Sequence, residues 1–484
     1  MKSVALHNLG CKVNSYEIEV MQQMLQEKGY TIVPFDEIAD IYIVNTCTVT
    51  NIADRKSRQM LHRAKQKNPA ALVVAVGCYV QTGREDVEQD PCIDLAIGNN
   101  RKKDLASILE EYLQDLERED AVAENAGEAR SNVDKTLHDT TVIDINHTAE
   151  YEEMTLKQTA EHTRAYIKIQ DGCNQFCSYC VIPYARGRVR SRRAEDIIRE
   201  ITGMARAGYR EIVLTGIHIS SYGIDFEEEA WKRGESVSVL KEDEERRDYS
   251  GSSKLIDLLE RIHDIEGIER IRIGSLEPRI INEETADRMA ALPKLCPHFH
   301  LSLQSGCDAT LHRMNRKYTA EEYAESVTLL RKVFEHPAIT TDVIVGFPGE
   351  TEEEFAQTKV FLDRIRFFEM HIFKYSKRAG TRAAVMPDQV PDPVKTERSV
   401  ELLAMEKEQS KLFRAHYVGR EVEVLLEETK QIHGKEYLLG HTVDYVKVAI
   451  PLEKNKNLCT NTVVLGKVQG FLTDEIVTID TITT

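Results

Sequence analysis

The chain has 484 residues, a formal net charge of −17 and ten cysteines. One hydrophobic core does not fill a chain of this length, so about three domains are expected. The negative charge argues against a protein that coats nucleic acid without specificity. No apolar run reaches the roughly 20 residues that span a bilayer, and the first residues lack the apolar segment of a secretory signal. We therefore expect a cytoplasmic protein with no membrane partner, in which cysteines serve metal or redox chemistry rather than disulfides.

The first part of the chain alternates short apolar runs with helical patterns, which predicts an open parallel sheet covered by helices. We assign this domain to residues 1–114, with helices that include 16–28 and 53–67. Residues 115–160 are polar, acidic and poorly periodic, which predicts a long linker that is partly disordered. The expected strands of the sheet are residues 4–9, 31–35, 41–45, 72–76 and 95–97.

A second alternation begins near residue 164, and its six strand–helix units predict a partial (β/α)6 barrel over residues 161–393. An acidic stretch at 225–252, which contains the only tryptophan, Trp231, interrupts the second unit and is expected to be a surface insertion. Helices are expected at residues 194–207, 255–265 and 320–334. The expected strands are residues 165–170, 211–215, 270–274, 298–303, 340–345 and 370–375.

Three prolines, Pro387, Pro391 and Pro393, end this alternation. A helix at 394–415 is expected to connect to a last domain at 416–484. Short, closely spaced strands there predict a small β-barrel, so the whole chain belongs to the α/β class with an added β domain. The strands expected in this barrel are residues 421–426, 437–439, 445–450, 462–468 and 475–480.

Cys173, Cys177 and Cys180 directly follow the first strand of the central domain. Three thiolates within eight residues can bind three irons of a four-iron cluster, and no fourth cysteine follows nearby. One iron then stays open to a substrate or cosubstrate, as in other metal sites with an open position. The alternatives are a zinc knuckle or thiols that only pack.

The CxxxCxxC spacing, with Tyr179 before the last cysteine, resembles the signature of the radical S-adenosylmethionine superfamily. The resemblance implies that the open iron binds S-adenosylmethionine. It also implies that one electron cleaves the sulfonium, and that the resulting 5′-deoxyadenosyl radical takes hydrogen from an unactivated C–H bond.

Six residues at strand ends are candidates for binding this cosubstrate. Thr215 and Gly216 correspond to the superfamily's position near the methionine amino group. Glu277, Gln304 and Asp342 end the next strands and could contact the ribose or the carboxylate, while Gly346 is expected to shape the adenine pocket. The alternative is structural, because polar residues often cap loops and Gly–Pro turns are common structural devices.

A second cysteine set is dispersed: Cys11, Cys47 and Cys78 follow the first, third and fourth expected strands. The carboxyl ends of parallel strands meet at one edge of an open sheet, where ligands bind. We therefore expect these three thiols to converge on a second site, although a single cysteine is more often a buried small hydrophobe. The other four cysteines, expected to be structural, are Cys92, Cys296, Cys307 and Cys459.

Five motifs extend the resemblance over nearly the whole chain to the methylthiotransferases, and the last barrel resembles the RNA-binding TRAM domain. Within that family, the Cys-Lys-Val-Asn string resembles the branch that acts on threonylcarbamoyladenosine in tRNA. The motifs are NLGCKVN (8–14), NTCTVT (45–50), GCYVQ (77–81), DGCNQFCSYCVIPYARG (171–187) and DVIVGFPGET (342–351).

The resemblance implies two 4Fe–4S clusters and methylthiolation of carbon 2 of the modified adenosine next to the anticodon. Cys173, Cys177 and Cys180 would hold the cluster that binds S-adenosylmethionine. Cys11, Cys47 and Cys78 would hold the cluster that carries the sulfur, and a second S-adenosylmethionine would supply the methyl group. The implied partners are the tRNA anticodon stem-loop, an electron donor such as flavodoxin or ferredoxin, and a sulfur donor.

We expect some arginines of a basic run after the cysteine loop to contact RNA phosphates or the cosubstrate carboxylate, with a solvated face as the alternative. Its arginines are Arg186, Arg188, Arg190, Arg192 and Arg193. His371 and Tyr375 are candidates for the base pocket, against a core or surface role.

Three other functions stay open from the sequence. Two are methylthiolation of isopentenyladenosine in tRNA and methylthiolation of an aspartate on a ribosomal protein. The third is a noncatalytic iron–sulfur protein that binds RNA and senses or transfers electrons.

Overall fold

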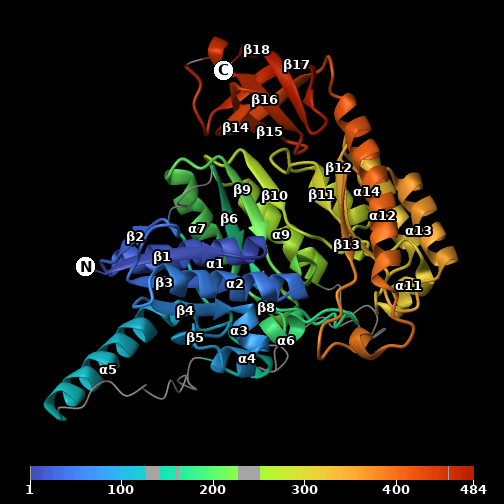
Figure 1. The fold of residues 1–484 in the computed structure, drawn as a ribbon. Helices are drawn as coiled ribbons and strands as arrows, with labels where there is room; N and C mark the ends of the chain where they lie inside the picture. The colour runs from blue at the N-terminus through green and yellow to red at the C-terminus, as the bar shows by residue number, and fades with distance from the viewer. Residues whose placement is uncertain (1, 127–141, 158–162, 227–250, 456, 484) are drawn as a thin grey trace.

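The computed structural model describes residues 2–126, 142–157, 163–226, 251–455 and 457–483. An amino-terminal parallel sheet packs against one side of a central barrel of strands and helices, and a small barrel at the carboxyl end lies over one end of the central strands (Figure 1). Within the described residues, no helix has both the length and the apolar character needed to cross a membrane.

The amino-terminal sheet is entirely parallel, in the order β2-β1-β3-β4-β5, as the alternating pattern predicts. Its central strands are buried on both faces, which explains their continuous apolar sequences. The strands are β1 (Ser3–Asn8), β2 (Thr31–Val33), β3 (Ile41–Thr46), β4 (Leu72–Gly77) and β5 (Leu95–Ile97). The helices are α1 (Lys12–Glu27), α2 (Asn51–Lys67), α3 (Cys78–Thr82), α4 (Arg84–Glu88) and α5 (Leu105–Ala126).

The prediction of a linker over residues 115–160 is wrong for the part that the structure describes. Helix α5 continues to Ala126, and residues 142–157 run back along the molecule with Ile145, Met154 and Leu156 buried. The Tyr16 hydroxyl on α1 donates a hydrogen bond to the carbonyl of Met154 over 2.5 Å. The sequence did not reveal this packing, because these apolar side chains are few and are buried against surfaces that other elements provide. Residues 127–141 and 158–160 lie outside the described residues.

Six parallel strands form the central partial barrel as two three-stranded sheets, β10-β9-β6 and β11-β12-β13. Isolated bridges, such as Ile271 to Leu295 and Leu276 to Leu301, connect the two sheets. The strands are β6 (Arg164–Lys168), β9 (Glu211–Thr215), β10 (Arg270–Ile273), β11 (His298–His300), β12 (Ala338–Val345) and β13 (Glu369–Lys374). The short strands β7 (Gln170–Asp171) and β8 (Arg190–Ser191) pair across the loop that carries the cysteines.

Helices cover the outside of this barrel (Figure 1). Helix α9 begins at Gly251, inside the predicted insertion, while Trp231 and the remainder of 227–250 lie outside the described residues. Thr319 and Thr351 each close a capping box at the start of a helix, which explains why α12 and α13 begin where they do. The helices are α6 (Ile182–Arg186), α7 (Ala194–Arg206), α9 (Gly251–His263), α10 (Glu283–Ala290), α11 (Asp308–Arg313), α12 (Ala320–Val333) and α13 (Glu352–Ile365).

The barrel interior is polar. Side chains alternate between the two faces of a strand, and Ile167, Ile212 and Ile271 join the hydrophobic core beneath the helices. The alternate positions therefore face inward, and ion pairs between strands confirm this for β9 and β10, where Arg272 Nε lies 2.7 Å from Glu211 Oε1. A polar interior suits the binding of a polar substrate or cosubstrate.

Helix α14 (Asp392–Ala415) leads to a closed barrel in the order β14-β15-β16-β18-β17, as predicted. The turn after β15 enters the open end of the central barrel: Arg270 Nη1 donates to the carbonyl of His441 over 3.0 Å, and the Tyr445 ring stacks on His298 at 4.8 Å. The strands are β14 (Glu421–Ile432), β15 (Lys435–Thr442), β16 (Lys447–Pro451), β17 (Val463–Thr473) and β18 (Ile476–Thr483).

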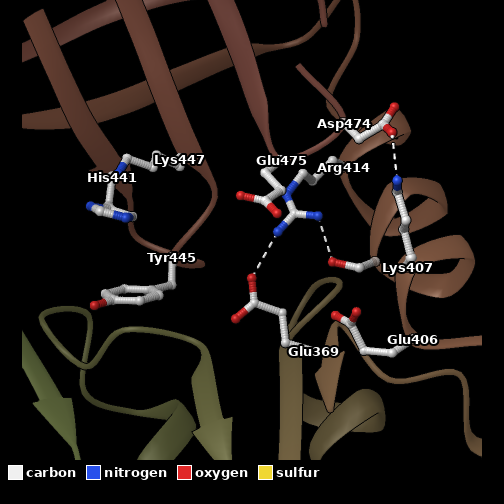
Figure 2. A pocket seen from close by; sticks show the side chains of 10 residues that line it. Glu369, Glu406, Lys407, Arg414, His441, Tyr445, Lys447, Asp474 and Glu475 are labelled. Atoms are coloured by element: carbon white, nitrogen blue, oxygen red, sulfur yellow. Dashed lines mark hydrogen bonds and ion pairs between the residues drawn. The ribbon is translucent and has the colours of Figure 1, made fainter. Parts of the chain in front are cut away.

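A polar cleft of about 310 Å³ remains between α14, β13 and the carboxyl-terminal barrel (Figure 2). Arg414 spans it and lies 2.7 Å from Glu369, while Lys411 and Lys407 both pair with Asp474. The Arg414 pair connects α14 to β13, and the two lysine pairs connect the same helix to the last barrel.

Candidate functional site

The first cysteine set lies on one short loop after β6. Cys173 donates its backbone N–H to Gly187 over 3.0 Å, and Cys180 donates to Cys177 over 2.9 Å, so the loop folds back on itself. Gly172 has φ +72°, and a Cβ there would lie 1.8 Å from the carbonyl oxygen of Arg188. Only glycine therefore allows the loop to close, which explains the Asp-Gly-Cys sequence.

The three sulfurs of this loop lie close enough to interact. Burial, together with the neighbouring Cys177, raises the pKa of Cys180 to about 12. Burial and then Cys177 and Cys180 raise the pKa of Cys173 in the same way. Arg316 Nη1 donates to the Sγ of Cys177 over 3.2 Å. Three clustered thiols beside one cation are suited to bind a metal cluster, whose positive charge stabilises thiolates.

The second cysteine set comes from three strand ends, as predicted. Cys11 follows β1, Cys47 follows β3, and Cys78 begins α3 directly after β4. Gly10 has φ +106°, and a Cβ on it would lie 2.9 Å from the Sγ of Cys47, so the loop around Cys11 packs directly on Cys47. Asn14 ties the two loops together through hydrogen bonds from its Nδ2 to the carbonyls of Leu9 and Thr46, at 2.6 and 3.0 Å.

The thiols of this second set also interact electrostatically. Burial, and then Cys78 and Cys11, raise the pKa of Cys47 to about 11. Burial raises the pKa of Cys11, and the nearby Arg186 opposes that shift. In the described part of the chain neither cysteine set forms a disulfide. Each set therefore fits a four-iron cluster with one open iron, by number, chemistry and convergence of its thiols.

One side chain links the two cysteine sets. Asn99, which is 2% exposed, donates from Nδ2 to the Sγ of Cys78 at 3.5 Å and to the carbonyl of Ala185 at 2.7 Å. Ala185 lies five residues after Cys180, on helix α6, which contacts α3. The two cysteine sites therefore belong to adjoining elements of one interface.

A buried charge network behind this interface was not predicted from the sequence. Arg186, 1% exposed, lies 2.8 Å from Glu17 on α1 and 3.1 Å from Asp171 before the cysteine loop. Lys102 and Lys168 also pair with Glu17. Burial raises the pKa of Glu17, but Arg186 and the two lysines outweigh it and hold that pKa well below its usual range. The only sequence signal was the position of each residue beside a cysteine motif.

Thr215 and Gly216 lie beside Gln170, the first residue of β7. Gln170 Oε1 accepts hydrogen bonds from the backbone N–H groups of Ile217 and His218, at 3.0 and 2.8 Å. A Cβ on Gly216 would lie 3.0 Å from the same oxygen. Glu277 is buried and lies 3.1 Å from His218 Nε2. The structure thus brings Thr215, Gly216 and Glu277 to one edge of the barrel, where their contact with a cosubstrate remains a prediction.

Gln304 follows β11 and bridges to Val343 on β12, the strand that carries Asp342. Gln304 donates its backbone N–H to Asp342 over 2.8 Å and has φ +71°, an unusual conformation for a residue with a side chain. Such backbone strain concentrates at functional sites. Gly346 has a structural explanation, because its N–H donates to Glu350 over 2.6 Å and a Cβ would lie 2.3 Å from Lys395.

The structure divides the five arginines of the basic run into a buried group and an exposed group, and contact of the exposed arginines with RNA stays a prediction. Arg186, Arg190 and Arg192 are each 1% exposed and are held by internal partners, such as the Glu200 that pairs with Arg192. Arg188 and Arg193 are exposed and are available to RNA. The sequence could not separate the two groups, because the partners lie far away along the chain.

The two base-pocket candidates behave differently. Tyr375 is 5% exposed and packs against Phe347, so it belongs to the core. His371 is solvent-accessible, although burial among protein atoms lowers its pKa. Cys11 and Lys12 are also exposed to solvent, although burial among protein atoms raises the pKa of Cys11 and lowers the pKa of Lys12.

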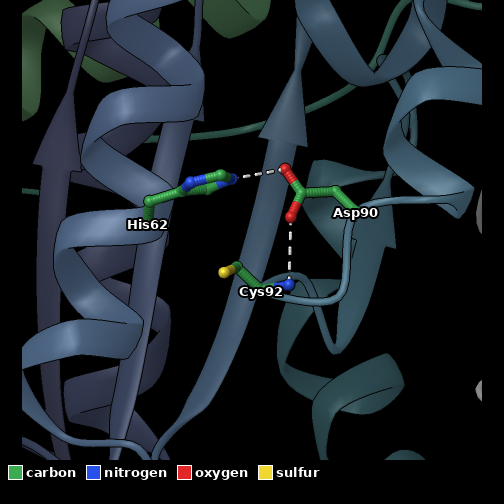
Figure 3. Close-up of side chains that lie close together, drawn as sticks. All are labelled: His62, Asp90 and Cys92. Carbon is green, nitrogen blue, oxygen red and sulfur yellow. Dashed lines mark hydrogen bonds and ion pairs between the residues drawn. The ribbon is translucent and has the colours of Figure 1, made fainter.

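Among the remaining cysteines, Cys296 and Cys307 are buried as expected, but Cys459 is exposed. His62, Asp90 and Cys92 form a compact group on the amino-terminal domain (Figure 3). Asp90 accepts a hydrogen bond from the backbone of Cys92 over 3.0 Å and lies 2.7 Å from Nε2 of His62. Its carboxylate is therefore already satisfied, and we assign the group a structural role.

Comparison with known proteins agrees with this geometry. Residues 3–98 match the uncharacterized protein family UPF0004, and residues 167–362 match the radical SAM superfamily. Threonylcarbamoyladenosine tRNA methylthiotransferase MtaB of Bacillus subtilis is 38% identical over 93% of this chain and 90% of the relative. The tRNA-2-methylthio-N(6)-dimethylallyladenosine synthase of Thermoanaerobacter sp. is 36% identical over 87% and 81%.

A solved structure supports the fold alone. The radical S-adenosylmethionine methyltransferase TsrM from Kitasatospora setae superposes with a TM-score of 0.50 at 15% identity, covering 79% of this chain and 77% of TsrM. The sequence relatives cover nearly all of both chains at more than 30% identity. The chain therefore belongs to the radical S-adenosylmethionine methylthiotransferase family.

Proposed function

We propose that the protein adds a methylthio group to carbon 2 of N6-threonylcarbamoyladenosine, next to the anticodon in tRNA. The observation that carries the proposal is the adjacency of two three-cysteine sites, which Asn99 links through Cys78 and Ala185. One site serves radical chemistry and the other serves sulfur, and the reaction needs both at one substrate atom.

The chemistry explains the need for a radical. Carbon 2 of adenine carries a hydrogen that is far too weakly acidic for any side chain to remove as a proton at neutral pH. The chemistry that a 4Fe–4S cluster and S-adenosylmethionine supply when bound is a one-electron cleavage that yields a hydrogen-abstracting radical. Cys173, Cys177 and Cys180 would hold the first cluster, and Cys11, Cys47 and Cys78 the second.

The protein's own contribution is positioning and electrostatics. Arg316 hydrogen-bonds to Cys177 and places a positive charge beside the first site. Gln170 orders the loop 216–218 at the strand end where the cosubstrate is expected. Thr215, Gly216, Glu277, Gln304, Asp342 and Gly346 are our candidates to contact the cosubstrate or shape its pocket. A single-stranded anticodon loop can present its base to such an enclosed site.

The choice of nucleoside rests on the Cys-Lys-Val-Asn string at residues 11–14 and on the relatives named for threonylcarbamoyladenosine, of which the Bacillus subtilis protein is 38% identical. The dimethylallyladenosine enzymes, at 36% identity, make that nucleoside the second candidate. We further propose that the carboxyl-terminal barrel is a TRAM-like domain that grips tRNA. The protein would act in the cytoplasm with an electron donor such as flavodoxin or ferredoxin and with a separate sulfur donor.

Mass spectrometry of tRNA nucleosides from a deletion strain tests the proposal. We expect 2-methylthio-N6-threonylcarbamoyladenosine to disappear while its unthiolated precursor accumulates, and a wild-type copy of the gene to restore it. Complementation with Cys78→Ala should fail and with Cys459→Ser should succeed. Undiminished product in a strain with no second copy of the gene would overturn the choice of nucleoside, and loss of the dimethylallyl product instead would favour the second candidate.

A noncatalytic iron–sulfur protein remains the contrasting function. Anaerobically reconstituted protein with dithionite and S-adenosylmethionine should release 5′-deoxyadenosine. The Cys173→Ala variant should release none. A protein that holds both clusters and still cleaves no S-adenosylmethionine would be a redox or RNA-binding protein.

A further inference from the structure

His300, Asp342 and His371 bring three potential metal ligands together on neighbouring strands of the central barrel. One ligand atom of each residue lies within 4.8 Å of those of the other two. In the register of β12 and β13, Asp342 stands opposite His371, and β11, which carries His300, pairs with β12. The two imidazole rings stack with their centroids 5.8 Å apart. His371 is exposed, whereas His300 and Asp342 are half-buried, so the group can be reached by a ligand.

The packing of these strands shows which face of the sheet the three side chains occupy. Successive side chains along a strand point to opposite faces. The residues next to the three candidates are buried in the hydrophobic core beneath the helices, and they are Phe299, Val343 and Met370. His300, Asp342 and His371 therefore point to the other face, which is the polar interior of the barrel.

The contacts of His300 are those of a metal-binding histidine. Its Nδ1 lies 3.0 Å from Thr340 Oγ1, and its Nε2 lies 3.3 Å from Asp342 Oδ2. A histidine that binds a metal usually donates its other ring N–H to a neighbouring acceptor, which fixes the direction of the ligand nitrogen. The buried hydroxyl of Thr340 can be this acceptor. Nε2 then presents a lone pair to the carboxylate, an arrangement that a cation between the two atoms stabilises.

The other two ligands are not engaged by the protein. Within the residues that the structure describes, neither the Asp342 carboxylate nor the His371 ring forms a hydrogen bond of normal geometry. The group shown in Figure 3 differs in this respect, because hydrogen bonds occupy both carboxylate oxygens of Asp90. Two imidazoles and one carboxylate are a ligand set that divalent transition metals accept.

We propose that His300, Asp342 and His371 bind one divalent transition-metal ion, such as Zn²⁺, Mn²⁺ or Fe²⁺, inside the central barrel. The site shares no residue with the two cysteine sets and does not depend on which nucleoside the protein modifies. Three protein ligands leave at least one coordination position open. An oxygen of a substrate or cosubstrate can take that position, and Asp342 would then act on that molecule through the ion.

Manganese binding to the full-length protein, reconstituted with both clusters in the oxidised state, tests this site. Mn²⁺ favours oxygen and imidazole nitrogen over thiolate, so it competes little for the cysteines. Electron paramagnetic resonance counts the free Mn²⁺, and electron spin-echo modulation detects imidazole nitrogen on the bound ion. Zn²⁺, which binds imidazole more tightly, is the second probe and is measured by equilibrium dialysis. The variants are His371→Gln, Asp342→Asn and Thr340→Val, and His62→Gln in the other group is the matched control.

The wild type and His62→Gln should each bind one Mn²⁺ per chain with imidazole coupling, above the weak binding to surface carboxylates. Thr340→Val keeps all three ligands and should weaken the affinity for both metals about 10- to 100-fold, the effect of losing the partner behind a ligand. His371→Gln and Asp342→Asn each remove a ligand and should weaken the affinity further. The iron content and circular dichroism of His371→Gln should equal those of the wild type, because this side chain is exposed.

Three outcomes would overturn the metal site. Neither metal binds the wild type more tightly than it binds His371→Gln, or the bound Mn²⁺ shows no imidazole coupling, or His62→Gln loses as much affinity as His371→Gln. The second result would mean that carboxylates alone hold the ion, and the third would move the ion to the group of His62. If Asp342→Asn fails to load its clusters, the exposed His371→Gln still decides between these outcomes. Failure of the proposed function would appear in the tRNA nucleosides and would leave these binding measurements unchanged.

Discussion

Arg186 Nη1 lies 2.8 Å from Glu17 Oε1, although 169 residues separate them along the chain. Glu17 belongs to the helix that starts beside Cys11, and Arg186 ends the helix that follows Cys180. Both side chains are 1% exposed. This ion pair therefore fixes one cysteine site relative to the other.

Glu17→Gln should destabilise the fold by about 3–5 kcal/mol, since it leaves buried cations without their counter-charge. Glu27 lies on the same helix as Glu17 and forms an exposed ion pair with Lys157. Glu27→Gln removes this pair and should lower the stability by less than about 1 kcal/mol. Urea titration followed by circular dichroism measures both. The pKa of Glu17 is lowered on folding, so its contribution is present above the unfolded-state pKa and is lost as the pH falls through the folded-state pKa. Equal midpoints for the two variants would contradict this role.

Iron analysis separates the two cysteine sites. Replacing Cys173, Cys177 and Cys180 together by alanine should remove half of the iron and sulfide of the reconstituted protein, and replacing Cys11, Cys47 and Cys78 should remove the other half. Each cluster would be held only by its own three thiolates. Cys459→Ser, at an exposed position, should keep the full content. If one triple variant lost all iron while remaining folded, the sites would not be independent.

Arg316→Gln should make the first cluster harder to reduce, because a positive charge and a hydrogen bond to the Sγ of Cys177 both stabilise the reduced, more negative state. A redox titration followed by electron paramagnetic resonance, in protein that lacks the second cysteine set, measures the potential. Arg316→Lys keeps the charge and should shift the potential less. Arg199→Gln, on the exposed face of α7, serves as the control. An unchanged potential in Arg316→Gln would show that the contact does not tune the cluster.

Asp444 lies in the turn that enters the central barrel, and burial raises its pKa to about 6 despite a hydrogen bond from Tyr417. The folded-state pKa exceeds the unfolded value, so stability is highest below the unfolded pKa and falls as the pH rises to about 6. Asp444→Asn should remove this fall and stabilise the protein at pH 8 by up to about 3 kcal/mol, with little effect at low pH. Thermal unfolding at pH 4 and pH 8 tests it, with the exposed Asp474→Asn as the control. A variant less stable than wild type at pH 8 would contradict the sign.

Local sequence patterns were sufficient to predict how the cysteines group and in what order the elements follow one another. The CxxxCxxC spacing is local, so Cys173, Cys177 and Cys180 share one loop whatever the rest of the chain does. Strand and helix periods in turn predicted that Cys11, Cys47 and Cys78 end parallel strands, and parallel strands place their ends at one edge. Both inferences depend on rules that act over a few residues or on one sheet.

Which charges are buried and which are exposed became evident only in the folded chain. Arg186 and Arg188 look alike in the basic run, yet the first is buried against Glu17 and the second is exposed. Residues 142–157 read as a linker but pack on α1. The physical reason is the same in each case. The free energy of a buried charge or an isolated apolar side chain depends on partners from distant elements, and a local sequence pattern does not predict those partners.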